Sequence, residues 1–363
     1  MINFLKNFVE KVKNKPLGYK IIFGLILVFY ITIVLLALIK SNYYMLTPGK
    51  VTPVKSVIEI ENYDSDEEVY TVSVFESRKI SLLNYLLVEK LKIDKNVEVG
   101  KLPSVTMSNK NEDIKGLIQK QTSINQSIIV AYTEAQKTNP EIKLEYQFLG
   151  RVVLFLGEET DQNLQLEDII THVDGTKVTN DGENPAEDFS NLIKSAGNKG
   201  KVTLTVLRDG KIDGKINDDI TKLKSHNVEV SLSNFHIGTL PFFDILEETV
   251  TPSYKINESS TQGPSGGLMQ TIAIYNTITK SNLTKGKIVM GTGQININGN
   301  VDPIDGEKQK VVTAKLYSAD IFFVPEENYA DALEQYNRIK NPKFKLVKVK
   351  TFADALQELE RLE

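Results

Sequence analysis

The chain has no cysteine, few histidines and no block of basic residues, and each absence excludes a class of function. Without cysteine among its 363 residues, the protein has no disulfide, thiol nucleophile, zinc-thiolate site or lipoprotein cysteine. The histidines, His172, His226 and His236, lack metal-ligand spacing, so we predict no metal site. Basic residues (43) and acidic residues (47) are spread along the chain, which argues against a nucleic-acid partner.

A nucleotide-binding P-loop is also missing. Such a loop places Ser or Thr directly after a Gly-Lys pair, so that the hydroxyl can reach the magnesium ion. Every Gly-Lys pair in this chain is instead followed by Val, Leu or Ile. The sequence therefore predicts no ATPase activity, no bound nucleotide and no other cofactor.

One long apolar run lies near the N-terminus. Ile21–Ile39 contains no charged residue and is bounded by Lys20 and Lys40. As a helix it would span about 28 Å, close to the roughly 30 Å of a hydrocarbon core. A cleaved signal peptide, the alternative, has a shorter apolar run and a small-residue cleavage site, which the residues after Leu38 do not offer. We therefore predict a retained transmembrane anchor at residues 19–40.

The charges before this run predict its orientation. Five lysines and one glutamate precede the apolar residues, and positive charge favours the cytoplasmic side. We expect a single-pass protein of a bacterial cell membrane, with residues 1–18 as a cytoplasmic tail and all residues after 40 extracytoplasmic.

The first extracytoplasmic segment, residues 41–140, has strand and helix signals. Val57–Glu61 and Val69–Phe75 have the composition of strands, and Glu112–Gln136 has apolar residues at helical spacing. Tyr44–Thr52, with Pro48 and Gly49, is expected to be a linker. From residue 226 onwards strand and helix signals alternate, which predicts an α/β domain.

The segment 144–222 has another pattern. Strand signals at Arg151–Leu156, Ile169–Val173 and Lys201–Leu207, with a helix signal at Phe189–Ser195, resemble a bacterial PDZ domain. The resemblance implies that Phe148, Leu149 and Gly150 form the loop that holds a peptide carboxylate. The following strand would accept the peptide as an added strand. The alternative is another small module of strands and helices.

Two short motifs carry the chemistry. Gly263-Pro264-Ser265-Gly266-Gly267 places a serine on a turn that opens a helix, and a second segment, 299–315, places lysines at the start of another helix. A serine hydroxyl needs a base to become a nucleophile, and a neutral lysine can serve. Lysine is neutral near pH 7 only if burial lowers its pKa from about 10.4.

Helical geometry distinguishes the lysines of the second motif. Lys310 shares a face with Ala314, among apolar neighbours, whereas Lys308 points about 200° away and can stay in water. Lys310 is therefore the predicted base, and Lys315 is expected to be a solvated helix charge.

The helix that follows Ser265 also predicts an oxyanion site. Helix N-termini offer unpaired N–H groups, and we expect Gly263 and Ser265 to be donors. Gly266 would let a substrate backbone approach closely.

Taken in order, Gly-Pro-Ser, the Gly-Thr-Gly around Thr292, the lysine motif and Phe-Val-Pro-Glu-Glu-Asn at 323–328 resemble the Ser–Lys dyad of Lon-type serine proteases. With the apolar run and the PDZ-like segment, the chain is most similar to membrane-anchored, PDZ-containing Lon-like proteases of the YlbL/SepM type. This implies an α/β (α+β) Lon-type proteolytic domain at 226–363, opened by the strands at 57–75 and the helix at 112–136. The PDZ domain would be inserted into it, and Thr292 would orient Lys310.

The resemblance implies an ATP-independent endopeptidase that acts on peptides or on flexible or unfolded protein segments. It leaves open whether the domain forms a homo-oligomer. Three residues depart from the family pattern: Gly266 replaces alanine, Asp305 replaces a glycine, and Glu307 replaces an apolar residue. Asp305 could keep Lys310 protonated, so the alternative is a catalytically silent, membrane-tethered PDZ adaptor.

Overall fold

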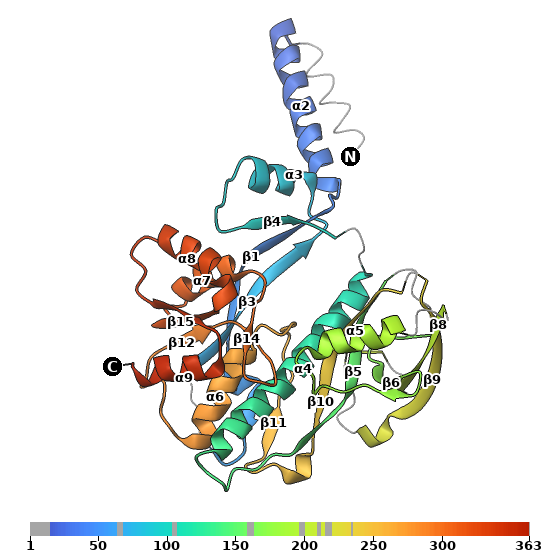
Figure 1. Cartoon of the computed structure of the whole chain (residues 1–363). Helices are drawn as coiled ribbons and strands as arrows, with labels where there is room; N and C mark the ends of the chain where they lie inside the picture. The colour runs from blue at the N-terminus through green and yellow to red at the C-terminus, as the bar shows by residue number, and fades with distance from the viewer. Residues whose placement is uncertain are drawn as a thin grey trace. The chain divides into compact units, whose positions relative to one another are not determined.

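The computed structural model (Figure 1) describes residues 15–63, 68–103, 107–157, 163–195, 200–208, 212–214, 220–233 and 235–362. Most of the predicted cytoplasmic tail, residues 1–14, lies outside this range. The chain divides into two compact units. The first unit comprises Met1–Thr47 and Phe75–Pro103, and the second comprises Pro48–Val74 and Ser104–Glu363.

The first unit contains the apolar helix α2 (Leu17–Leu38), none of whose side chains is buried. By length and composition α2 can cross a membrane. It is followed in this unit by α3 (Leu82–Tyr85), a π-helical turn (Leu86–Lys90) and β4 (Glu98–Lys101). β4 pairs antiparallel with the first residues of β1 (Tyr43–Pro53).

The prediction of a linker at Tyr44–Thr52 is wrong, because these residues belong to strand β1. Pairing with neighbouring strands outweighs the local turn preference of Pro48 and Gly49. Glycine is required at position 49 because the neighbouring strand approaches closely, and not because the chain turns there. A Cβ at this position would lie 2.3 Å from the carbonyl oxygen of Ser73 in β3 (Val69–Arg78).

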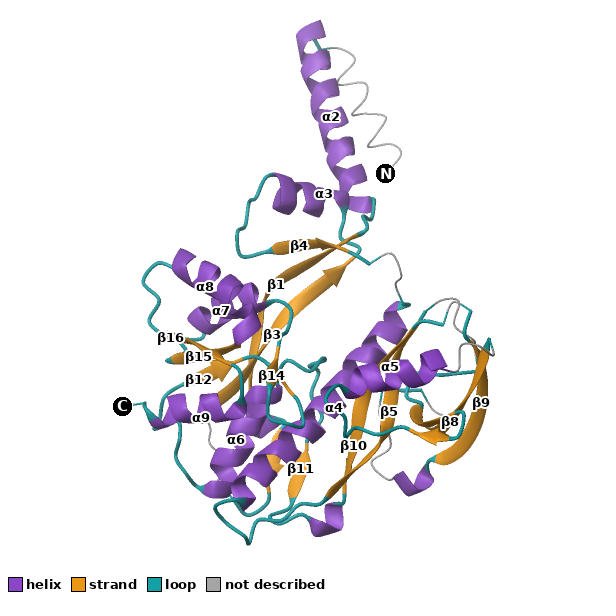
Figure 2. Cartoon of the chain, viewed as in Figure 1, coloured by secondary structure: helices purple, strands orange, loops and turns teal. Residues whose placement is uncertain are grey.

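The second unit contains a sheet with the strand order β16-β15-β12-β3-β1, and helices pack on it in layers. β12 (Val289–Gly291) pairs parallel with β3 and with β15 (Ile321–Pro325), and β15 pairs parallel with β16 (Lys345–Val349). Helices cover both faces (Figure 2), as parallel strands require. They are α6 (Gly267–Thr279), α7 (Glu307–Leu316), α8 (Tyr329–Arg338) and α9 (Phe352–Glu360).

Alternating side chains of β15 build the two cores of this layer structure. Ile321 and Phe323 join the apolar cluster of α6 and α9, whereas Phe322 and Val324 join that of α7 and α8. This strand belongs to the alternation of strands and helices predicted from residue 226 onwards. The last helix begins with a capping box, in which Thr351 and Asp354 form reciprocal hydrogen bonds.

The helix α4 (Asn109–Gln136) confirms the predicted helix at Glu112–Gln136. It contributes Ile124, Ile128 and Tyr132 to a core shared with α6 and with the strands β2 (Ile58–Ile60) and β11 (Tyr254–Ile256). β2 and β11 pair antiparallel with each other. α4 therefore lies directly beside the helix that follows Ser265.

A second sheet has the order β10-β5-β6-β8-β9, with β7 (Thr176–Lys177) on β6. Its strands are β5 (Tyr146–Leu156), β6 (Ile169–Val173), β8 (Lys201–Arg208), β9 (Lys224–Ser231) and β10 (Ile237–Ile245). It is accompanied by α5 (Pro185–Ser195). The sheet extends past residue 222, and its description as an inserted PDZ domain stays a prediction.

The remaining elements are short. β13 (Gln294–Ile295), which lies between the two motif segments, pairs antiparallel with β14 (Val301–Asp302), which lies within the second. The 3-10 turns are η1 (Val54–Ser56), η4 (Ile220–Lys222), η5 (Glu247–Thr249) and η6 (Glu326–Asn328).

Candidate active site

Ser265 lies in the turn directly before α6. The helix begins at Gly267, and the Gly267 N–H donates to the carbonyl of Pro264 at 3.2 Å. Ser265 is half-buried. Gly263 has a φ of +82°, which a residue with a side chain rarely adopts, so the turn depends on glycine there.

The glycines of this turn differ in their contacts and in the space available for a side chain. The N–H of Gly263 donates to the carbonyl of Gly116 in α4 at 2.9 Å, so in this conformation it is engaged and does not point to an oxyanion. A Cβ at Gly266 would lie 3.1 Å from Cγ2 of Thr71, which is tight but short of a clash. A Cβ at Gly267 would lie 2.8 Å from Oγ of Ser123, so this position requires glycine. The predicted oxyanion roles of Ser265 and Gly266 stay predictions.

Lys310 lies in the first turn of α7 and is 2% exposed. Burial lowers its pKa to about 7, while the nearby carboxylates of Glu307 and Asp305 oppose this shift more weakly. Its Nζ donates to Oγ1 of Thr292 at 3.1 Å. A lysine with this pKa is neutral in a substantial fraction of molecules near pH 7, and a neutral amine can accept a proton.

Thr292 connects the lysine to the serine turn. It follows β12 and is fully buried. Its hydroxyl accepts from Lys310 and donates to the carbonyl oxygen of Ser265 at 3.1 Å. The N–H of Gly293 donates to the same carbonyl at 2.9 Å. The fold therefore brings together Ser265, Thr292 and Lys310, which are widely separated in sequence.

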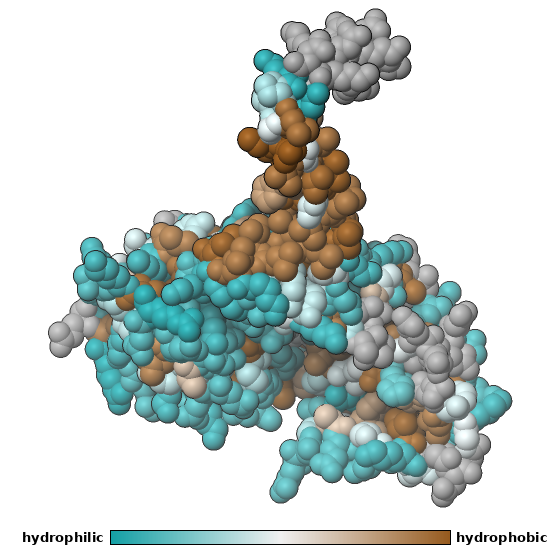
Figure 3. All heavy atoms as spheres, turned by 90° about the horizontal axis from the view of Figure 1, so that it is seen from above, coloured by the Kyte–Doolittle hydropathy of each residue, from teal (hydrophilic) through white to brown (hydrophobic). Residues whose placement is uncertain are grey.

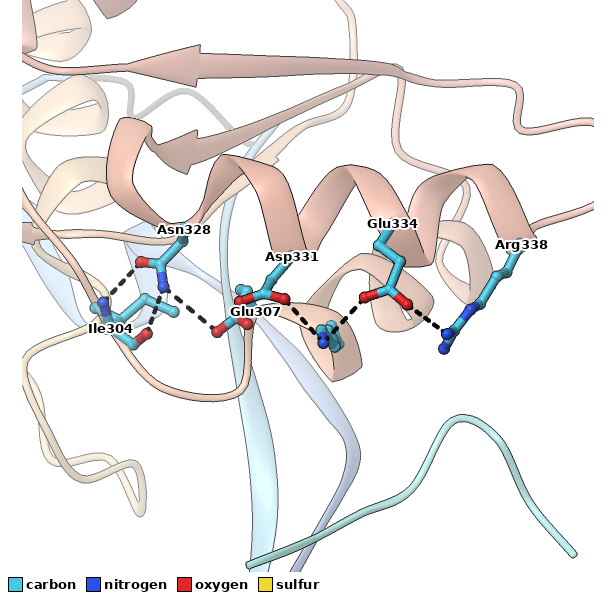
Figure 4. A network of polar contacts seen from close by, with 7 residues as sticks. Ile304, Glu307, Asn328, Asp331, Glu334 and Arg338 are labelled. Atoms are coloured by element: carbon cyan, nitrogen blue, oxygen red, sulfur yellow. Dashed lines mark hydrogen bonds and ion pairs between the residues drawn. The ribbon is translucent and has the colours of Figure 1, made fainter. Parts of the chain in front are cut away.

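Lys308 instead contacts acidic side chains of α8, which are labelled in Figure 4. It forms ion pairs with Asp331 at 2.9 Å and with Glu334 at 3.2 Å, both on α8. These carboxylates raise the pKa of Lys308, so it remains charged. The two lysines of one helical turn thus have opposite pKa shifts, because one faces the core and the other faces acidic side chains.

Asn328 is a positioning residue that the sequence analysis did not single out. Its Oδ1 accepts from the N–H of Ile304, and its Nδ2 donates to the carbonyl of Ile304, both at 2.9 Å. Nδ2 also reaches Oε2 of Glu307 at 3.5 Å (Figure 4). These contacts fix the turn that leads into α7 and Lys310. The Phe-Val-Pro-Glu-Glu-Asn motif ends at Asn328, but no local pattern indicates the contacts of its side chain with the distant Ile304 turn.

Two serines of α4 hold the other side of the turn that contains Ser265. Ser123 Oγ donates to the carbonyl of Pro264 at 2.9 Å, and Ser127 Oγ donates to the carbonyl of Gly267 at 3.0 Å. They occupy one face of α4, four residues apart. The available signal was this spacing of small polar residues within an apolar helix face.

The residues predicted as the PDZ carboxylate-binding loop are not in a loop. Phe148, Leu149 and Gly150 lie inside strand β5. β10 pairs with β5 from Tyr146 to Leu156, with Phe148 opposite Phe243, so this edge is already occupied. Strand addition requires an unpaired edge. The peptide-binding role of these residues stays a prediction.

A turn serine before a helix, connected through a buried threonine to a buried lysine with a pKa of about 7, suits acyl transfer by a hydrolase. Comparison with known proteins agrees with this class. Residues 257–360 match the family described as the Lon protease (S16) C-terminal proteolytic domain.

Curated relatives are also Lon proteases. The chain is 22% identical over 320 residues to the peroxisomal Lon protease homolog 2 of Kluyveromyces lactis, covering 84% of this chain and 31% of the relative. It is 24% identical over 216 residues to Lon protease 2 of Bacillus subtilis, covering 55% and 34% respectively. It is 34% identical over 97 residues to the Lon protease of Campylobacter jejuni, covering 26% of this chain and 12% of the relative. The chain thus spans about a third or less of these relatives' length, and the family match supports serine protease function for residues 257–360.

Proposed function

We propose that this protein is a membrane-anchored, ATP-independent serine endopeptidase of the Lon-like, PDZ-containing type. In this proposal Ser265 is the nucleophile and Lys310 is the general base. The observation that carries the proposal is the environment of Lys310: it is buried, its pKa is about 7, and its amine is connected through Thr292 to the backbone of Ser265.

The chemistry follows from these groups. Neutral Lys310 takes the proton of the Ser265 hydroxyl as Oγ attacks the scissile carbonyl carbon. The N–H of Ser265, in the turn before α6, stabilises the oxyanion of the tetrahedral intermediate. The lysine ammonium then returns its proton to the leaving amine, which yields an acyl-enzyme ester. Water, deprotonated by Lys310, hydrolyses this ester and restores the serine.

The electrostatics favour the enzyme over a silent adaptor. Asp305 is exposed, and its effect on the pKa of Lys310 is the smallest of the three contributions. Desolvation outweighs the two carboxylates together. The acidic departures from the family pattern therefore raise the pKa of Lys310 without holding the amine fully protonated at neutral pH.

Location and substrates complete the proposal. The apolar helix α2 would cross the membrane, with the lysine-rich N-terminus in the cytoplasm and the Lon-type domain outside. Because the chain has no P-loop, substrates would be peptides or flexible and unfolded segments. The PDZ-like sheet would recruit them.

The test is proteolysis of an unstructured protein by the full chain in vesicles without ATP. We expect cleavage by the wild type, and its loss in Ser265→Ala and in Lys310→Met. Lys308→Met is the matched control, since it removes a lysine from the same helical turn but not from the site, and it should retain cleavage. If the wild type is as inert as Ser265→Ala, Asp305→Gly is tested next. Continued inactivity would refute the protease and favour the adaptor.

A further inference from the structure

The first unit exposes a cluster of large apolar side chains outside α2. We call residues 82–95 the interfacial segment; it comprises α3, the π-helical turn and the residues that follow. Within it Leu91 is 68% exposed, Ile93 63% and Leu86 37%. Side chains of this size, gathered at the surface of a soluble domain, mark a contact with another apolar phase.

The segment starts beside the end of α2, where α3 is labelled in Figure 1, and backbone hydrogen bonds attach it there. The N–H of Leu82 donates to the carbonyl of Ile39 at 2.9 Å, and the N–H of Ser41 donates to the carbonyl of Ile80 at 2.8 Å. The rings of Tyr43 and Tyr85 lie 4.3 Å apart, centroid to centroid. The interfacial segment therefore begins where the apolar helix ends.

The length of α2 sets the depth of this junction. A helix of 22 residues is about 33 Å long, so a helix that crosses a core of roughly 30 Å ends at the bilayer boundary. Tyrosines are preferred at that boundary, where their rings contact lipid and their hydroxyls contact water. The junction with its paired tyrosines thus lies at headgroup level if α2 spans.

The charges around the apolar residues fit the same location. Lys79, Lys90, Lys92 and Lys95 lie in or next to the segment, against Glu89 and Asp94. Lys92 pairs with Glu89 at 3.0 Å, and Lys90 lies over the ring of Tyr85 at 5.6 Å. Lysines that flank apolar side chains can extend towards lipid headgroups and attract anionic lipids.

We propose that the interfacial segment lies in the boundary of the same bilayer that α2 crosses, on the side where α2 ends. Leu86, Leu91 and Ile93 insert among the outer acyl carbons, and the lysines contact anionic headgroups. Figure 3 shows apolar surface continuing from α2 onto the residues at its base. The inference rests on the proposed anchoring by α2. A second lipid contact would fix the first unit against the bilayer, which one helix alone leaves free to rotate.

The absence of cysteine makes this proposal directly testable. Single-cysteine variants of the full chain, each labelled with an environment-sensitive fluorophore, are reconstituted in vesicles of phosphatidylcholine and phosphatidylglycerol. Leu91→Cys and Ile93→Cys report the segment, Phe29→Cys reports the centre of α2, and Glu98→Cys on the exposed face of β4 is the control in the same unit. Quenching by spin-labelled lipids measures contact with the acyl region.

We expect strong quenching at Phe29, quenching about half as strong at Leu91 and Ile93 because they lie at shallow depth, and little at Glu98. If Phe29 is quenched and Leu91 and Ile93 behave like Glu98, the docking is refuted while the anchor stands. If Phe29 itself is not quenched, the anchor fails and this inference fails with it. Labels at Leu91 and Ile93 that are shielded from water but not quenched would refute lipid contact and indicate a second copy of the chain.

Discussion

The pKa of Lys310 makes the pH profile of cleavage the most demanding test of the site. In the proposed mechanism the neutral amine of Lys310 is the base, so activity should rise with pH as Lys310 loses its proton and level off above its pKa of about 7. An unperturbed lysine near pKa 10.4 would be neutral in fewer than about one molecule in a thousand at pH 7. Burial therefore accounts for roughly three orders of magnitude in the amount of active base.

Removing a carboxylate should shift this profile in a defined direction. Glu307 makes the larger of the two carboxylate contributions, and it raises the pKa of Lys310. In Glu307→Gln the pKa should fall below that of the wild type, so the activity should level off at lower pH. Asp305→Asn should cause a smaller shift in the same direction.

The assay is the pH dependence of kcat/KM for a fluorogenic peptide, measured for the wild type and both variants. Lys315→Ala is the control, because Lys315 is an exposed residue of the same helix. A wild-type profile that keeps rising to pH 10 would show that Lys310 is not desolvated in the working enzyme. A Glu307→Gln profile displaced to higher pH would contradict the electrostatic argument.

Three further predictions concern stability and positioning. Lys310→Met should abolish cleavage but raise the thermal midpoint at pH 7. The folded-state pKa of Lys310 lies below its unfolded value, so the buried lysine destabilises the wild type at neutral pH, and wild-type stability rises with pH up to about 10. The stability gained by the variant, up to about 5 kcal/mol, should therefore shrink when melting is measured at pH 10. Ser123→Ala removes the donor to the Pro264 carbonyl and should lower kcat by roughly fivefold with little change in KM, which corresponds to the net free energy of about 1 kcal/mol expected for one hydrogen bond. An unchanged kcat would show that this hydrogen bond is not needed to hold the turn. Gly263→Ala should destabilise the fold by about 1 kcal/mol or more, because its φ of +82° is costly for alanine, and equal denaturation midpoints for variant and wild type would contradict this.

The local motifs were accessible from the sequence because each depends on nearest neighbours. The turn before α6 needs Pro264 and glycines, and α7 places Lys310 and Lys308 on different faces by helical geometry alone. The apolar helix and the capping box at Thr351 follow from equally local patterns.

Local sequence patterns predicted the structure wrongly where pairing with distant strands or helices determines the backbone conformation. β1 is a strand because its neighbours pair with it, despite Pro48 and Gly49. β5 continues through Phe148–Gly150 because β10, some 90 residues later in the chain, occupies its edge. The amide of Gly263 is engaged by Gly116 of α4. None of these partners is near in sequence, so no local preference indicates them.

The sequence by itself determined which residues are chemically able to act: a serine on a glycine turn, a lysine with an apolar helix face, and a threonine between glycines. Only the tertiary structure decided that the Lys310 amine is buried, that the Thr292 hydroxyl connects it to the Ser265 backbone, and that α4 and Asn328 hold the two turns from either side. The physical reason is that desolvation and hydrogen-bond geometry are properties of the packed interior. They arise only when segments that are far apart in the chain exclude water together.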